Sequence, residues 1–275
     1  MTDVIDAEVS EWLSRFERFD VVGSTNDVVA GWLAEGTEEV CVAVADVQTS
    51  GRGRGGRTWE APPGGALLLS VGFRPTWLDP EHAWRLAAIV TLTMAEASEV
   101  AAGLRPGTVQ LKWPNDLVAI DARAGDVRKL AGVLGETDGL GTRDARAIIG
   151  IGVNADWKAE DFPPELATTM TSLAVLAPGQ QIDREVIIHE FLKRLDHAID
   201  GLRSGTFPAA AWRDRQLTNG ARVRIEWPDG STETVHAMDV DPDSGALLVG
   251  ELGGGGQQRA VLVGEIRHLR LGGIV

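Results

Sequence analysis

The fold is decided by the stretch Val40-Cys-Val-Ala-Val-Ala-Asp-Val-Gln-Thr-Ser-Gly-Arg-Gly-Arg-Gly-Gly-Arg57 and the run Ala66-Leu-Leu-Leu-Ser-Val-Gly-Phe73 that follows it. Val40–Val47 and Ala66–Phe73 are almost wholly apolar, which predicts two buried strands. The connection between them places Arg52, Arg54 and Arg57 among glycines. Glycine lets backbone N–H groups approach a ligand closely, and guanidinium groups match carboxylate and phosphate oxygens. We therefore expect this loop to hold a small anion.

Other functions of a glycine-rich or Arg-Gly segment fit less well. Gly51, Gly53 and Gly56 match the spacing of a dinucleotide fingerprint, but that motif must open a helix, and the prolines at 62 and 63 prevent one. The chain has no Gly-x4-Gly-Lys-Ser/Thr motif of a P-loop. Nucleic-acid-binding Arg-Gly tails are repetitive and basic, whereas this segment occurs once. A mobile surface loop without a role remains an alternative, but the mutual repulsion of the arginines favours a bound anion.

Composition narrows the class of protein. The chain has 275 residues, 40 acidic against 26 basic side chains and a net charge of −14, a balance that disfavours nucleic acid and anionic membranes as partners. The single cysteine, Cys41, lies in an apolar run, so we expect a buried, inert thiol and a reducing compartment. The N-terminus lacks the pattern of a signal peptide, and no apolar run approaches the ~20 residues of a membrane span. We expect a cytoplasmic protein.

The apolar patterns of residues 1–217 predict an α+β domain. The expected helices are Asp6–Phe19, Val28–Ala34 with Thr25 or Asn26 as its cap, Pro80–Ala102, Arg184–Leu202 and Ala209–Gln216. The expected strands include a short one before Ser24, Val109–Lys112, Leu117–Ile120 paired with Lys129–Thr137, and Ala145–Val153. Together with the two opening strands they predict a mixed, largely antiparallel sheet with helices packed on one side.

The composition changes after about Gln216 and predicts a second domain, residues 218–275. Short alternating segments are expected to be strands: Arg222–Trp227, Thr232–Val240, Ala246–Gly250, Ala260–Val263 and Glu265–Leu271. Pro228-Asp-Gly230 and Pro242-Asp-Ser-Gly245 mark hairpin turns between them. This pattern is typical of a small all-β barrel.

Polar residues stand at the ends of several expected strands: Gln48, Lys112, Asn115, Asp116, Lys129 and Asn154. Each is weak evidence alone, because a lone Lys is usually solvated and a lone Asn usually belongs to a turn. Lys129 is more specific, since the apolar residues after it bury and so position its strand. Gly132, Gly150 and Gly152 lie inside strands, which indicates close approach by a ligand or another backbone.

These segments, in this order, resemble biotin protein ligases (holocarboxylase synthetases). The resembling runs are Gly23-Ser-Thr-Asn26, Gln48-Thr-Ser-Gly-Arg-Gly-Arg-Gly-Gly-Arg-Thr-Trp59, Lys112-Trp-Pro-Asn-Asp116, Lys129-Leu-Ala-Gly132 and Gly150-Ile-Gly-Val-Asn154. The segment ending Gly264-Glu-Ile-Arg-His-Leu-Arg270 resembles the C-terminal barrel of the same family. The resemblance implies the biotin–lipoate ligase fold, which is similar to class II synthetases. Gly55 departs from it, standing where many members carry Arg or His.

The resemblance implies an ATP-dependent biotin–[acetyl-CoA-carboxylase] ligase, a carbon–nitrogen ligase. Biotin and ATP would form biotinyl-5′-AMP, with Mg²⁺ bound mainly through the ATP phosphates, and biotin would pass to a lysine of a biotin carboxyl carrier domain. Some members carry an N-terminal DNA-binding domain. Only one expected helix precedes Gly23 here, so we expect a ligase without repressor function. We also expect it to act as a monomer or weak homodimer.

The resemblance also implies roles for individual residues. Those expected to contact biotin are Ser24, Thr25, Asn26, Gln48, Arg52, Gly53, Arg54, Lys129, Gly132, Gly150 and Gly152. Those expected on the nucleotide side are Arg54, Arg57, Trp59, Lys112, Asn115, Lys129 and Asn154. Lys129, Arg54 and Arg52 would stabilise the reacting carboxylate and phosphate. Asp116 would orient Lys112 or accept the proton of the acceptor lysine, and Trp59 would cover the adenylate.

Two alternatives stay open at this point. A lipoate ligase or octanoyl transferase shares the fold but lacks the Gly-Arg-Gly-Arg loop followed by Trp. A non-catalytic biotin or nucleotide sensor would not need the full set of cations, Arg52, Arg54, Lys112 and Lys129. The glycines also make the empty loop costly to order, by about 1–2 kcal/mol per residue. We therefore expect a loop that is mobile without ligand and ordered around the adenylate.

Overall fold

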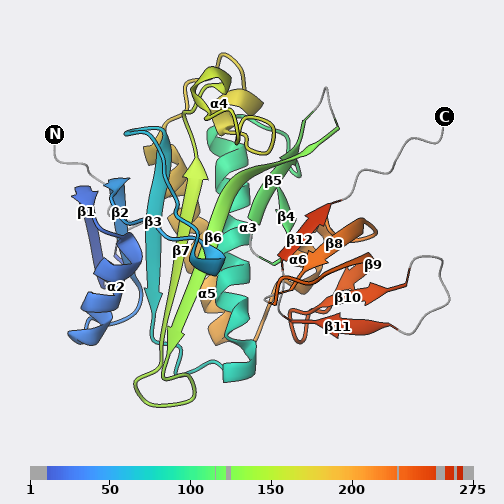
Figure 1. The fold of residues 1–275 in the computed structure, drawn as a ribbon. Helices are drawn as coiled ribbons and strands as arrows, with labels where there is room; N and C mark the ends of the chain where they lie inside the picture. Colours follow the sequence, from blue (N-terminus) through green and yellow to red (C-terminus); the bar gives the residue numbers. More distant parts are fainter. Residues whose placement is uncertain are drawn as a thin grey trace, which may run out of the picture.

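The computed structural model describes residues 11–114, 116–121, 125–227, 229–251, 258–262 and 265–268. Within these ranges the main sheet has seven strands in the order β1-β2-β3-β7-β6-β5-β4 (Figure 1). Their bounds are β1 Arg15–Val22, β2 Cys41–Gln48, β3 Ala66–Phe73, β4 Gln110–Lys112, β5 Asp116–Ile120, β6 Val127–Asp138 and β7 Arg146–Asn154. The β1–β2 pair is parallel and the other neighbours are antiparallel. The predicted mixed, largely antiparallel sheet is thus confirmed.

Helices cover both faces of this sheet. The described helices are α2 Thr25–Ala34, α3 Trp84–Ala101, α4 Leu173–Leu176, α5 Arg184–Arg203 and α6 Ala209–Asp214, with short 3-10 turns at η1 Arg54–Gly56, η2 Pro80–His82 and η3 Ala159–Asp161. The long helices α3 and α5 pack on one face, where they share a core with Val42 and Val44 of β2. Helix α2 packs on the opposite face against Cys41 and Ala43 (Figure 1). The two long helices therefore lie on one side as predicted, and α2 lies on the other.

Strand β3 lies at the centre of these layers. All eight of its residues are buried, as its unbroken apolar run predicts. Alternate side chains of β2 enter the two cores because successive residues of a strand point to opposite faces, and alternate side chains of β3 from Leu67 to Phe73 enter the core beneath α3 and α5. The polar Ser70 is the exception in β3, and it is completely buried.

The predicted helix Asp6–Phe19 is wrong where the structure describes it. Residues 6–10 lie outside the described ranges, and β1 begins at Arg15. Strand β1 pairs with β2 from Arg15↔Cys41 to Val22↔Gln48. Residues Trp12, Leu13 and Phe16, whose spacing indicated a helix, pack against the main core. Pairing with β2 satisfies the backbone and overrides the local periodicity.

The N-cap of α2 also differs from the prediction. Ser24, rather than Thr25 or Asn26, occupies the cap position, and its side chain makes no capping hydrogen bond. The side chains of Thr25 and Asn26 instead bond residues of β2, β3 and β6. The start of this helix is therefore shaped by contacts with the sheet.

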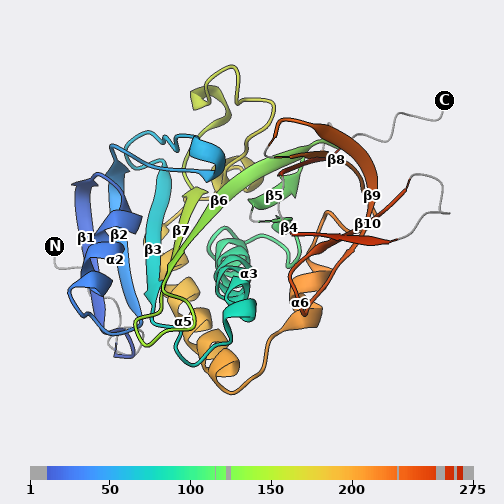
Figure 2. The same cartoon turned by 60° about the horizontal axis from the view of Figure 1, so that its bottom comes forward.

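The C-terminal strands form a second sheet in the order β11-β10-β9-β8-β12 among the described residues. Their bounds are β8 Arg222–Glu226, β9 Thr232–Val240, β10 Leu247–Gly250, β11 Arg259–Val261 and β12 Glu265–His268. Neighbours pair antiparallel, and β11 and β12 stand at its two edges. Figure 2 shows this sheet beside β4, β5 and α3. The described residues thus form a small antiparallel sheet, as the sequence predicted, and its closure into a barrel stays a prediction.

Direct contacts join this second sheet to the first. The Trp113 ring N–H donates to Gly245 O at 3.0 Å, and its backbone N–H donates to Thr218 Oγ1 at 3.1 Å. Leu217 N–H donates to Leu111 O at 2.8 Å. These hydrogen bonds hold β4 and the turn after it against the C-terminal sheet. The division into two domains at residues 217 and 218 stays a prediction.

No helix in the described ranges combines the length and apolarity needed to cross a membrane.

Cys41 provides a test of this packing. Its side chain is completely buried between β2 and α2, and burial raises the pKa of the thiol to about 11 because the thiolate is poorly solvated there. We expect iodoacetamide at pH 8 to leave the native protein unmodified and to label one thiol in guanidinium chloride, as read by mass spectrometry. Equal labelling rates in the two conditions would contradict the buried placement.

Candidate functional site

A cavity of about 1300 Å³ opens between the glycine-rich loop, the main sheet and the C-terminal sheet. The predicted site residues that line it are Ser24, Thr25, Asn26, Gln48, Arg52, Gly53, Arg54, Arg57, Trp59, Lys112, Asp116, Lys129, Gly132, Gly150 and Gly152. They come from α2, the end of β2, the loop, the β4–β5 turn, β6 and β7. The structure therefore brings together residues that lie up to 128 positions apart, from Ser24 to Gly152.

One end of the cavity is a buried hydrogen-bond network. The Thr25 backbone N–H and hydroxyl approach Gln48 Oε1 at 2.7 and 2.9 Å. The Thr25 hydroxyl also lies 2.7 Å from Ser70 Oγ, and the Ser70 hydroxyl donates to Asn26 Oδ1 at 2.6 Å. Thr25, Asn26 and Ser70 are each at most 4% exposed. These polar groups satisfy one another and so hold fixed positions at the cavity wall.

Glycines form the floor of the cavity. Gly132 of β6 pairs with Gly152 of β7 in register, and Gly150 pairs with Ser70 of β3. A Cβ on Gly150 would overlap Asn26 Oδ1, and a Cβ on Gly152 would lie 2.6 Å from the Trp59 indole. The sequence predicted close approach by a ligand or another backbone at these glycines, whereas in this structure the side chains of Asn26 and Trp59 occupy that space.

Trp59 lies on that floor. A Cβ on Gly132 would come within 3.0 Å of the Trp59 ring, and Lys129 Nζ is 5.5 Å from the ring centroid. The ring nitrogen of Trp59 is buried without a hydrogen-bond partner. The indole therefore occupies the sheet surface in this conformation, whereas the sequence predicted a cover over bound adenylate.

Two lysines share one carboxylate at the other end of the cavity. Lys129 Nζ is 2.7 Å from Asp116 Oδ1, and Lys112 Nζ is 3.8 Å from Asp116 Oδ2. The Lys129 backbone is fixed as well, since its N–H donates to Thr169 O and its carbonyl accepts from Thr171 N–H, both at 2.8 Å. The predicted orienting role of Asp116 toward Lys112 is compatible with this geometry, although its shorter contact is to Lys129.

The glycine-rich loop is a narrow turn stabilised by its own backbone. Gly53 N–H donates to Arg57 O at 2.7 Å, and Trp59 N–H donates to Gly51 O at 2.9 Å. Gly55 and Gly56 have φ angles of 65° and 74°, which side chains rarely adopt. The positive φ at position 55 favours glycine, the residue that this chain carries there.

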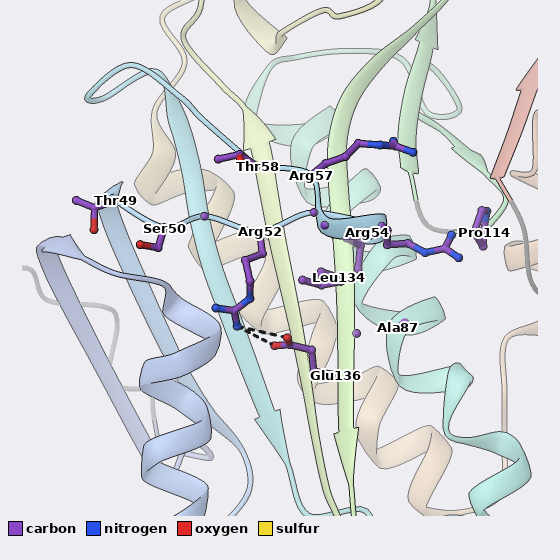
Figure 3. A pocket seen from close by; sticks show the side chains of 16 residues that line it. Thr49, Ser50, Arg52, Arg54, Arg57, Thr58, Ala87, Pro114, Leu134 and Glu136 are labelled. Atoms are coloured by element: carbon purple, nitrogen blue, oxygen red, sulfur yellow. Dashed lines mark hydrogen bonds and ion pairs between the residues drawn. The ribbon is translucent and has the colours of Figure 1, made fainter. Parts of the chain in front are cut away.

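Arg52 points from this loop toward Glu136 (Figure 3) and also binds Asp27. Its Nη1 and Nη2 donate to the Asp27 carboxylate at 2.9 and 2.7 Å, and Nη2 lies 3.3 and 3.4 Å from the two oxygens of Glu136. The hydrogen bond from Arg52 holds the pKa of the Asp27 carboxyl below its usual value. Arg52 is thus neutralised by protein carboxylates in this conformation.

Two predicted site residues are not placed in the cavity. Asn115 lies outside the described residues. Asn154 is completely buried and does not line the cavity. Its side-chain amide donates to Thr171 O at 2.9 Å. Its predicted contact with nucleotide remains untested, and its position suits a structural role at the end of β7.

Several residues of the site were not found from the sequence. Ser70, the only polar residue in β3, carried a signal, because a hydroxyl in an apolar run needs a partner. Asp27 and Glu136 carried none. The segment Glu165–Met170 and the residues Gly220–Arg222 also line the cavity, and neither has a motif that singles it out.

Within the described ranges, no three His, Cys, Asp or Glu side chains gather to hold a metal ion. The carboxylate at the cationic end, Asp116, already contacts two lysines. Among the residues that the structure describes at this end, no dedicated cluster of metal ligands is therefore present.

The glycine floor predicts the effect of one methyl group. Gly150→Ala would force Asn26 out of its network, so we expect a loss of about 1–3 kcal/mol in unfolding free energy, measured by urea denaturation. Gly135→Ala is the matched control on β6, because its Cβ would meet Ile149 at an ordinary 3.4 Å. Equal stabilities of the two variants would show that Asn26 is not held as described.

Comparison with known proteins places this arrangement in a family. Residues 18–154 match the biotin/lipoate A/B protein ligase family. The chain is 35% identical over 263 residues to the biotin–[acetyl-CoA-carboxylase] ligase of Mycobacterium tuberculosis, covering 94% of this chain and 91% of that protein. It is 31% identical over 232 residues to the bifunctional ligase/repressor BirA of Bacillus subtilis, covering 84% and 67%. Its fold matches the biotin protein ligase of Aquifex aeolicus in complex with biotin and ATP, with a TM-score of 0.73, 25% identity and coverage of 93% and 99%. This chain belongs to the biotin/lipoate A/B protein ligase family, and within it to the biotin protein ligases.

Proposed function

We propose that this protein activates biotin with ATP and transfers it to a lysine of a biotin carboxyl carrier domain. The observation that carries the proposal is a single cavity with a hydrogen-bonding end at Thr25 and Gln48, a glycine floor, and a cationic end at Lys112 and Lys129. A neutral ureido ring suits the first end, and a carboxylate meeting a phosphate suits the second. The named relatives, which include a biotin–[acetyl-CoA-carboxylase] ligase, support the same substrates.

The first reaction joins two anions. A carboxylate oxygen of biotin attacks the α-phosphorus of ATP, the bond to the bridging oxygen breaks, and pyrophosphate leaves. Repulsion between the reactants must be offset by positive groups held in place before reaction. Lys129 is suited to this because its backbone is bonded on both sides and its ammonium is held by Asp116. We assign Lys129, with Arg52 and Arg54 of the loop, to the reacting carboxylate and phosphate.

The second reaction releases AMP. The amine of the acceptor lysine attacks the acyl carbon of biotinyl-5′-AMP, forms the amide and loses a proton as AMP departs. Asp116 is the carboxylate of the cationic end, and its partnership with Lys129 suits it to orient that lysine. We therefore assign Asp116 an orienting role and leave its proton-accepting role as the second candidate.

The remaining loop and turn residues are assigned to the nucleotide. Arg57, Lys112 and Trp59 line the same cavity as Lys129. Because the Trp59 indole lies on the glycine floor, it must leave that surface when a ligand occupies it. Once displaced from the glycine floor, the Trp59 indole would be free to cover the adenylate, the role that the sequence predicted for it.

We assign no protein site to Mg²⁺, because no three metal-ligating side chains gather in the described part of the chain. Magnesium retains several waters and is commonly bound by substrate phosphates with few protein carboxylates. The proposal is that Mg²⁺ enters with ATP.

Pyrophosphate exchange tests the function directly. We expect the purified protein to exchange labelled pyrophosphate into ATP when biotin is added, and to do so neither with lipoate nor with octanoate. Exchange with lipoate or octanoate in place of biotin would identify a lipoate-type ligase. Biotin binding without exchange would identify a sensor, and either result would refute the proposal.

Lys129→Ala tests the assignment of the principal cation. Loss of one preorganised charge at a reacting centre typically lowers the rate by about 10²–10³-fold, and we expect biotin-dependent exchange to fall by that factor with the unfolding temperature little changed. Lys193→Ala, at an exposed position of α5, is the control and should retain the parent rate. An exchange rate within about twofold of the parent for Lys129→Ala would remove this residue from the mechanism.

A further inference from the structure

The carboxylate of Glu136 contacts two parts of the site at once. Its Oε2 accepts a hydrogen bond from Asn26 Nδ2 at 2.6 Å, at the buried end of the cavity. Arg52 Nη2 lies 3.3 Å from Oε1 and 3.4 Å from Oε2, on the side of the loop (Figure 3). Asn26 belongs to α2 and Arg52 to the glycine-rich loop. One side chain of β6 therefore joins the polar wall of the cavity to the loop above it.

We propose that Glu136 is a positioning residue that couples recognition of the biotin ring to the position of the loop. It would act through Asn26 on one side and through Arg52 on the other. The proposal rests on the proposed function, because it assigns biotin to the end of the cavity that Asn26 lines.

The first step of the argument is the orientation of the Asn26 amide. A carboxylate accepts hydrogen bonds and donates none, so Asn26 must turn its NH₂ group toward Glu136. Its oxygen then faces Ser70, whose hydroxyl donates to it at 2.6 Å. Because the single Ser70 proton is used on Asn26, Ser70 Oγ can only accept from the Thr25 hydroxyl, 2.7 Å away. The one Thr25 hydroxyl proton is then shared between Ser70 Oγ and Gln48 Oε1, which lies 2.9 Å away. The charge on Glu136 thereby sets the direction of the hydrogen bonds along the cavity wall.

The second step is burial, which makes that direction difficult to change. Asn26 is 4% exposed and Ser70 is completely buried, so a reversed amide would leave unsatisfied polar groups away from water. The Asn26 amide also packs directly on the backbone of Gly150, so closely that a Cβ at Gly150 would overlap the Asn26 oxygen. Asn26 therefore has little freedom while Glu136 is charged and in place.

The third step is the loop. Asp27 binds Arg52 through both guanidinium nitrogens, at 2.9 and 2.7 Å, and Glu136 adds a longer contact to the same group. These pairs are partly exposed, with 59% of the Asp27 side chain and 38% of the Glu136 side chain accessible. Exposed ion pairs are individually weak, so two acids holding one arginine suit a loop that must open. Asp27 contacts the loop arginine, whereas Glu136 contacts that arginine and Asn26.

The strand geometry explains why Glu136 reaches both partners. Gly132, Leu134 and Glu136 alternate along β6 on the face that lines the site, while Ala131 and Val133 enter the core beneath α3. Glu136 thus follows the glycine floor along the same face of the sheet. Its partner in β7 is Ile148.

Three variants separate the two contacts. Asp27→Asn weakens the hold on Arg52 and leaves the Asn26 contact intact. Glu136→Gln removes the charge but keeps an oxygen that can accept from Asn26. Glu136→Leu removes both contacts and leaves the Asn26 amide without its partner. Asp138→Asn, at an exposed position of the same strand, is the matched control for loss of an acid.

The measurements are the dissociation constant for biotin alone by calorimetry, the rate of trypsin cleavage at Arg52–Arg57 without ligand, and the unfolding temperature. We expect Asp27→Asn, Glu136→Gln and Glu136→Leu all to speed loop cleavage. We expect Glu136→Leu to raise the dissociation constant by about tenfold or more, as loss of a hydrogen bond to a charged group predicts. Glu136→Gln should raise it less, and Asp27→Asn by less than about threefold. Asp138→Asn should match the parent throughout.

Two outcomes would overturn the proposal. Biotin affinity of Glu136→Leu within about twofold of the parent would show that Asn26 does not depend on Glu136. Equal loss of affinity in Asp27→Asn and Glu136→Leu would show that only the hold on the loop matters. The cleavage and unfolding measurements need no biotin. They test the two contacts even if the parent fails to bind biotin, a result that would refute the proposed function alone.

Discussion

The register of β3, β7 and β6 is the constraint on which the rest of the site depends. Ser70 stands opposite Gly150, and Leu68 stands opposite Gly152, which in turn pairs with Gly132. This pairing places a buried hydroxyl beside a surface without side chains. Thr25 and Asn26 in the first turn of α2 can then pack directly on the sheet, where Ser70 forms a hydrogen bond with each of them. A shift of one residue would turn these groups to the opposite face and place apolar side chains in the cavity.

Three positively charged side chains of the site form ion pairs with protein carboxylates: Arg52, Lys112 and Lys129. Asp116 holds Lys129, and Asp27 with Glu136 holds Arg52. In a chain of net charge −14 this arrangement places positive groups where an anionic substrate is to bind without leaving them to repel one another. On the proposed function, an incoming carboxylate or phosphate would replace one anionic partner of these cations with another, so the cations would not have to be gathered from water. On the same proposal, the loop would change position when Arg52 leaves Asp27 and Glu136 to bind a substrate anion.

The sequence predicted the central strands and the two long helices well, because their apolar runs are long and have one dominant period. Ala66–Phe73 was predicted with the bounds that the structure has. The failed helix prediction at residues 11–19 has a physical cause: Trp12, Leu13 and Phe16 satisfy a helical spacing, yet the backbone from Arg15 pairs with β2. The candidate site was found through the order of its motifs, whereas Asp27 and Glu136 have no local signal, since their contacts arise only from strand register and from the approach of α2. Ser70 carries the signal of a hydroxyl in an apolar run, but that signal does not identify its partners.

The sequence by itself determined the membership of this chain in its family, the glycines and cations that line the cavity, and the strands that carry most of them. These properties depend on residue type and on spacing along the chain, and the linear sequence contains both. Tertiary structure alone decided which carboxylate holds which cation, that Trp59 lies on the glycine floor, and that Glu136 joins the loop to the cavity wall. Those contacts span many positions of the chain, so they exist only once the sheet has set its register and buried its polar groups in pairs.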